Sequence, residues 1–139
     1  MLVGASRRRL EDARTLHGQK RWAGAMYLGG YAIECSLKAY VCFSQAKQDL
    51  RDTSLPSGTG GINSHNLSTL IAVVAPIQRA VVLDRTGVYK SAWNTVTSMW
   101  RVDSLRYWNQ QGYESASATF ISSVEILHRF LLEQQGEGR

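Results

Sequence analysis

Two short stretches of the sequence hold most of the side chains that could do chemistry. In RVDSLRYWNQQGY, residues 101–113, Arg101, Arg106 and Tyr107 place two permanent cations and a stackable ring in one polar segment. In YLGGYAIECSLKAY, residues 27–40, Glu34 and Lys38 stand four apart, in the favoured order for an intrahelical ion pair. The first stretch predicts phosphate or nucleotide binding, and the alternative is a local salt bridge with a packed tyrosine.

His65 is the candidate catalytic residue, because only histidine titrates near neutral pH without being perturbed. Arginine is not a base at neutral pH and tyrosine titrates too high, so Arg101, Arg106 and Tyr107 are candidates for binding only. A histidine that opens a helix is more often a structural capping residue, which is the alternative for His65. The histidines, cysteines and acids show no metal-ligand spacing, so we expect no metal and no other cofactor.

The elements that must position these groups are helices. Apolar residues recur at helical spacing and no strand-like alternation competes with them. The sequence predicts an all-α fold, with residues 1–139 forming one domain and residues 48–64 a flexible loop rich in glycine. We expect helices over Ser6–Gln19, Arg21 to about Ala46, Ile77–Leu83, Val88–Trp100 and Glu114 to about Gln135. Between the second and Ile77 we expect a helix with Ser64 as its N-cap that ends near Pro76.

The stripe of Tyr89, Trp93, Val96 and Trp100 is interpreted as core rather than as an aromatic platform for nucleic acid. The predicted helix 21–46 is buried nearly all round and is long enough to cross a membrane. Glu34 and Lys38 fall past its middle, where charges are costly, so we favour a protein without a membrane span.

Gly29 and Gly30 lie inside this helix and together cost about 2 kcal/mol relative to alanine. We therefore expect another helix to approach them closely. Glu34 and Lys38 then mark a polar edge that faces a groove or a partner subunit, or Lys38 extends along the bundle surface into solvent.

The net charge of +5 is concentrated at the N-terminal end, where a basic helix attracts phosphate or presents a solvated face. Cys35 and Cys42 are two helical turns apart, beyond disulfide reach, and are expected to be reduced core residues. No secretory signal is visible, and the expected location is the cytoplasm.

The stretch YLGGYAIECSLKAY resembles the second helix of HEPN domains (higher eukaryotes and prokaryotes nucleotide-binding), in which an aromatic and small residue precede glutamate and then Leu-Lys-Ala. Glu34, Leu37, Lys38 and Ala39 fit this pattern. SHNLSTLI, residues 64–71, resembles the His-acidic-Leu sequence that opens the third helix of the family, with Asn66 where an acid is common. Both motifs agree in order and spacing, and the resemblance covers almost the whole chain.

The resemblance implies an up-and-down helical bundle with a four-helix core plus short extra helices, commonly dimeric. Many members are metal-independent endoribonucleases with an Arg-x4-6-His motif near the start of the last long helix. This sequence departs from that motif, because no histidine follows Arg101 or Arg106 at the required spacing.

The expected function is therefore a homodimeric module that binds RNA, nucleotide or a partner protein. Toxin–antitoxin or defence systems with a nucleotidyltransferase partner are the setting that the resemblance implies. One alternative is a divergent metal-independent endoribonuclease that uses Arg101, Arg106 and His65. Another is a purely structural protein-interaction module that uses the basic N-terminal helix and the glycine-rich loop.

Overall fold

The computed structural model describes residues 2–53, 66–100 and 113–136, and within these ranges its regular elements are helices alone. They are α1 (Leu2–Gly18), α2 (Trp22–Ser44), the short 3-10 helix η1 (Leu50–Asp52), α3 (Leu67–Val73), α4 (Ala75–Val82), α5 (Val88–Met99) and α7 (Glu114–Glu133). The predicted all-α bundle is confirmed, and its long helices match the predicted ones to within a few residues.

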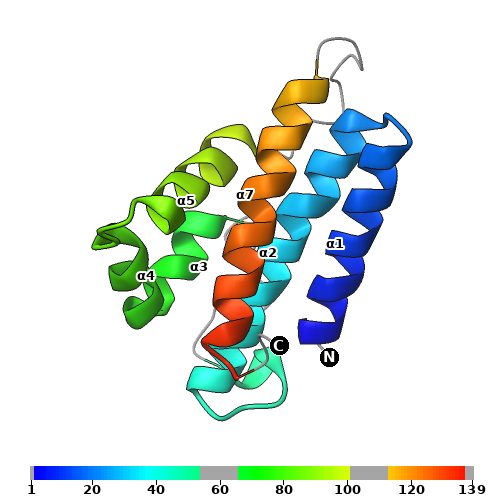
Figure 1. Cartoon of the computed structure of the whole chain (residues 1–139). Coiled ribbons are helices and arrows are strands. Elements are labelled where there is room, and N and C mark those ends of the chain that lie inside the picture. The colour runs from blue at the N-terminus through cyan, green and yellow to red at the C-terminus, as the bar shows by residue number, and fades with distance from the viewer. Residues whose placement is uncertain (1, 54–65, 101–112, 137–139) are drawn as a thin grey trace.

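The long helices α1, α2 and α7 lie side by side, and the shorter α3, α4 and α5 gather on the side away from α1 (Figure 1). α1 packs chiefly on α2, α2 packs on α7 and α3, and α7 packs on α5. α2 is thus the helix on which the rest of the bundle is assembled. This agrees with its sequence, which is apolar nearly all round.

The core is formed by the apolar stripes that the sequence indicates. On α7 the buried side chains include Phe120, Val124, Leu127 and Leu131. On α5 Val96 and Trp100 are buried, while Tyr89 and Trp93 are partly buried and pack against the core. The interpretation of the α5 aromatics as core residues is confirmed.

The two glycines of α2 lie where other side chains touch its backbone. A Cβ atom on Gly30 would lie well under 3.0 Å from the indole ring of Trp100, which no rotamer adjustment at Gly30 could relieve. A Cβ on Gly29 would meet Phe120 at 3.2 Å and Ile121 at 3.3 Å, both on α7. The predicted close approach is confirmed, and it offsets the low helix propensity of the two glycines.

Two predicted helix boundaries are wrong. The N-cap of α3 is Asn66 rather than Ser64, since the Asn66 side chain accepts a hydrogen bond of 3.1 Å from the Thr69 backbone N–H. Pro76 lies in the first turn of α4 and does not end the preceding helix, which stops at Val73. Proline is tolerated in a first turn because the N–H that it lacks has no intrahelical partner there.

The predicted loop at 48–64 begins with η1, which closes on a hydrogen bond of 3.0 Å from the Asp52 N–H to the Asp49 carbonyl. Residues 54–64 of that loop lie outside the described part of the chain. Cys35 and Cys42 are both free thiols, as predicted, but only Cys42 is buried. In the ranges that the structure describes, none of the helices combines the length and hydropathy that crossing a membrane requires.

Candidate functional site on the polar face of α2

One face of α2 carries Tyr27, Tyr31, Glu34 and Lys38, spaced so that all four lie along the same side of the helix. We call this row the polar stripe. Lys38 Nζ donates to Glu34 Oε2 at 2.9 Å, which confirms the predicted ion pair. The stripe is the clearest concentration of polar groups inside the helix that organises the bundle.

The pair is more deeply placed than the sequence suggested. Only 3% of the Glu34 side chain and 12% of the Lys38 side chain are exposed, so the prediction that Lys38 extends into solvent is wrong. Glu34 is the buried member of the polar stripe, while Tyr27, Tyr31 and Lys38 are partly exposed. Removal of one partner of such a buried ion pair is strongly destabilising, because it leaves the other charge buried without compensation.

Aromatic side chains form the other half of the stripe. The rings of Tyr27 and Tyr31 lie 5.3 Å apart, and Tyr31 meets Trp100 edge-on at 6.0 Å. Trp100 Nε1 donates to the Tyr27 carbonyl at 3.1 Å. Burial, aided by the hydrogen bond with Tyr27, raises the pKa of Tyr31 to about 12, so its hydroxyl stays protonated at neutral pH.

Trp100 therefore fixes the end of α5 against α2. Its ring covers Gly30, its indole N–H is bonded to α2, and it directly precedes Arg101 in the chain. This connection is the local reason for placing the candidate site on this face.

Cys35 lies beside the stripe, half-buried on α2. Burial raises the pKa of its thiol, and the neighbouring Glu34 carboxylate raises it further, while Lys38, Arg9 and Arg8 act in the opposite direction. The reactive form of cysteine is the thiolate, so this thiol is a poor nucleophile at neutral pH.

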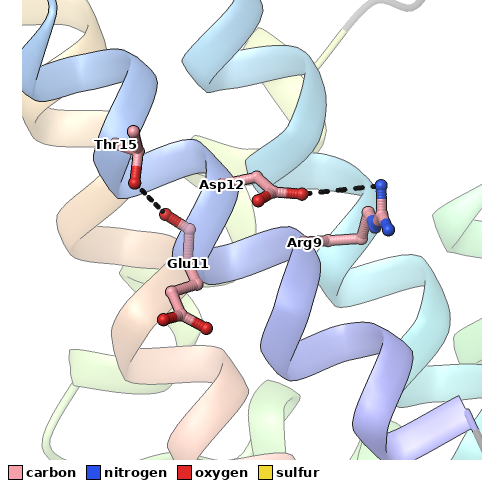
Figure 2. A network of polar contacts seen from close by, with 4 residues as sticks. All are labelled: Arg9, Glu11, Asp12 and Thr15. Carbon is pink, nitrogen blue, oxygen red and sulfur yellow. Dashed lines mark hydrogen bonds and ion pairs between the residues drawn. The ribbon is translucent and has the colours of Figure 1, made fainter.

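The basic face of α1 is partly neutralised by its own acids. Arg9 reaches along the helix to Asp12 at 3.6 Å, and Thr15 Oγ1 donates to the Glu11 carbonyl at 3.1 Å (Figure 2). The Thr15 bond goes to the backbone and neutralises no charge, and an exposed i, i+3 ion pair such as Arg9–Asp12 contributes little to stability. The exposed Arg9–Asp12 pair favours the prediction of a solvated face over that of a dedicated anion site on α1.

The predicted site residues fall into two groups. Glu34 and Lys38 lie together in the polar stripe. Arg101, Arg106 and Tyr107, and the catalytic candidate His65, lie outside the described residues. Those four therefore stay predictions, and the described part of the site is its α2 side.

Sequence reasoning missed a set of contacts between α1 and α7. His128 Nε2 lies 3.0 Å from Ser6 Oγ, His17 Nδ1 lies 2.9 Å from Ser117 Oγ, and Arg14 Nη2 lies 2.7 Å from Glu125 Oε2. We call these three contacts the polar seam. Their partners are 100 or more residues apart in sequence, and no local spacing signals them.

The Ser6–His128 contact resembles a nucleophile–base pair, but its hydrogen bond runs in the opposite direction, from histidine to serine. Ser6 Oγ already donates its one proton to the Val3 carbonyl at 2.7 Å, so it accepts from His128 Nε2–H. Both side chains are also buried, with 0% and 6% exposed, respectively. A histidine that donates to serine cannot remove the serine proton, so this pair is structural.

Within the described ranges no group of three or more histidine, cysteine or acidic side chains is arranged to hold a metal ion. Comparison of the chain with protein-family models, with curated proteins and with solved structures gives no match.

Proposed function

We propose that this chain is a HEPN-like, non-catalytic module that binds RNA or nucleotide phosphates next to the polar stripe of α2. The observation that supports it best is the anchoring of Trp100 on Gly30 and Tyr27, because Arg101 follows Trp100 directly in the sequence. In this proposal Arg101 and Arg106 bind phosphate and Tyr107 stacks on a base.

Glu34 and Lys38 have a supporting role in this proposal. Their short ion pair occupies the Lys38 ammonium and leaves it little exposed. A lysine held in this way is better suited to fixing the floor of a site than to neutralising a phosphate that arrives from solvent. The cations that bind ligand are then the two arginines.

The wider setting of the proposal comes from the resemblance alone. As a HEPN-like module the chain acts as a homodimer, with a nucleotidyltransferase-type protein as a partner in a toxin–antitoxin or defence system. Gel filtration with light scattering tests the dimer separately from ligand binding. A monomer at micromolar concentration would remove the dimer from the proposal and leave the phosphate site to be tested by itself.

The test is fluorescence anisotropy with a labelled single-stranded RNA of mixed sequence, about 12 nucleotides long, between about 50 and 200 mM salt. We expect salt-sensitive binding by the wild type. In the double variant Arg101→Ala/Arg106→Ala, the slope of log K against log salt should fall by about 1.4, because each phosphate contact on a single strand contributes about 0.7.

The matched control is Arg79→Ala/Arg85→Ala, which removes the same charge from two exposed positions on and after α4. It should leave the slope within about 0.3 of the wild-type value if binding is local to the proposed site. Equal losses in both double variants would show diffuse electrostatic attraction and contradict the proposal. Absence of salt-sensitive binding would contradict it in favour of the protein-interaction module.

The same RNA, incubated without metal and resolved on a gel, tests the alternative of a divergent ribonuclease. The proposal predicts intact RNA. Cleavage that is lost in His65→Ala and in Arg106→Ala would overturn the non-catalytic part of the proposal and identify those side chains as the site.

A further inference from the structure

The polar seam holds a histidine that the proposed function does not use. His128 lies on α7 with 6% of its surface exposed, and it donates to Ser6 on α1. Burial, together with the positive charges of Arg7 and Arg14, lowers the pKa of His128 to about 4. At neutral pH the imidazole is therefore uncharged, and this is the form that the seam accommodates.

The charges around His128 offer no compensation for a proton. Arg7 and Arg14 face it from α1, and on its own helix Glu125 is already bonded to Arg14 through two contacts, of 2.7 and 2.8 Å, while Arg129 adds a further cation in sequence. On α2 the charges along the polar stripe are Glu34 and Lys38, which neutralise each other within their ion pair. An imidazolium at position 128 would thus be buried and would face the positive charges of Arg7 and Arg14.

α1 is also the long helix with the smallest apolar attachment. Its buried side chains are Ser6, Leu10 and Ala13, of which one alone is large and apolar, whereas α2 and α7 each bury many more. α1 packs chiefly on α2, and the polar seam joins it to α7 through side-chain hydrogen bonds, among which Ser6–His128 is the contact with both side chains buried.

We propose that the polar seam is an acid-sensitive latch: protonation of His128 places a new cation opposite Arg7 and Arg14 and releases α1 from α7 while the remaining helices stay packed. The released state would uncover the side of α7 that carries Ser117 and His128. This device is independent of RNA binding and would change which surface of the bundle is available as pH falls.

The direction of the effect follows from linkage. The pKa of His128 is lowered while α1 is packed on α7. The neutral histidine therefore contributes its full stabilisation of this packed state above its ordinary pKa of about 6.5, and the stabilisation is lost as pH falls from there towards about 4. At about pH 5 the equilibrium for release of α1 should be about 30-fold more favourable than at about pH 7.5.

Hydrogen–deuterium exchange at about pH 7.5 and about pH 5, corrected for the intrinsic pH dependence of exchange, tests the latch. We expect the amides around Leu10 and Ala13 to lose up to about 30-fold protection at the lower pH, while those of α5 keep theirs. Parallel loss in α1 and α5, or no loss in α1, would overturn the proposal.

The variant His128→Gln keeps an N–H donor for Ser6 and cannot be protonated, so its α1 protection should be nearly independent of pH. Should that variant fold poorly, Arg7→Gln provides a second test, because it retains His128 and removes one of the cations opposite it. It should lose less protection at low pH than the wild type. Arg8→Gln removes an exposed charge that does not act on His128 and should behave like the wild type. A wild-type response in both His128→Gln and Arg7→Gln would refute the latch.

Discussion

Two ion pairs of nearly equal length lie in very different surroundings in this protein. Glu34–Lys38 on α2 is 2.9 Å long and almost fully covered, whereas Arg14–Glu125 across the polar seam is 2.7 Å long with 53% and 37% of its side chains exposed. Distance alone would rank them as equals. Burial ranks them differently, because water screens the seam pair and competes with it, while water has little access to the α2 pair.

The same contrast extends to the neighbouring packing. Around the α2 pair, Trp100 and α7 touch the helix backbone at Gly30 and Gly29 and leave no room for a side chain. Across the seam, polar bridges join α1 to α7. The α2 region should therefore tolerate substitution poorly and respond little to solvent conditions. In the seam, the exposed Arg14–Glu125 pair should tolerate substitution and respond to salt, while the buried Ser6–His128 contact should respond to pH.

The largest expected effect is that of Lys38→Met, which keeps the length of the side chain but leaves the Glu34 carboxylate without its cation. Loss of one partner of a buried pair costs about 3–5 kcal/mol of the free energy of unfolding. Urea unfolding monitored by circular dichroism measures it. The control Lys90→Met, on the exposed face of α5, should change the free energy of unfolding by less than about 0.5 kcal/mol. An equally small change in Lys38→Met would show that water screens the α2 pair as it screens a surface pair.

Gly30→Leu should cost about 3 kcal/mol, because its Cβ and further atoms would occupy the space of the Trp100 ring. Gly18→Leu is the matched control, since a Cβ at Gly18 meets nothing within 4 Å. Thermal unfolding of both variants separates the close contact from the general cost of replacing a helical glycine. An unchanged melting temperature in Gly30→Leu would contradict the packing described for Trp100.

A change of opposite sign is expected at Ser36, which is fully buried and whose hydroxyl has no hydrogen-bond partner among the described residues. Replacement by alanine removes the unsatisfied group and should raise the free energy of unfolding by about 1 kcal/mol. The exposed Ser122 on α7 provides the control, for which Ser122→Ala should be nearly neutral. A loss of stability in Ser36→Ala would mean that the hydroxyl is satisfied in solution.

The smallest effect is expected for the seam pair. Arg14→Gln removes an exposed ion pair and should lower the free energy of unfolding by no more than about 1 kcal/mol, with the difference shrinking at high salt. Urea unfolding at low and high salt measures both. A loss as large as that of Lys38→Met would abolish the distinction between the two regions.

The sequence predicts the parts of this architecture that depend on local periodicity. The stripes of α2, α5 and α7, the close approach at Gly29 and Gly30, and the Glu34–Lys38 pair all follow from residues a few positions apart. The N-cap was misassigned because Ser64 and Asn66 both have N-capping side chains and spacing does not choose between them. The polar seam could not be predicted, since Ser6 and His128 meet only after the bundle has folded.

The central claim is that ligand binds beside the polar stripe of α2 and not along α1. Photocrosslinking of an RNA that contains 4-thiouridine, followed by mass spectrometry of the crosslinked peptides, tests it most directly. We expect crosslinks in peptides that cover 101–112 and the neighbouring Tyr27–Tyr31 part of α2, weakened in Arg101→Ala/Arg106→Ala. Crosslinks confined to Leu2–Gly18, or unaffected by the two arginine substitutions, would contradict the claim and assign binding to the basic helix.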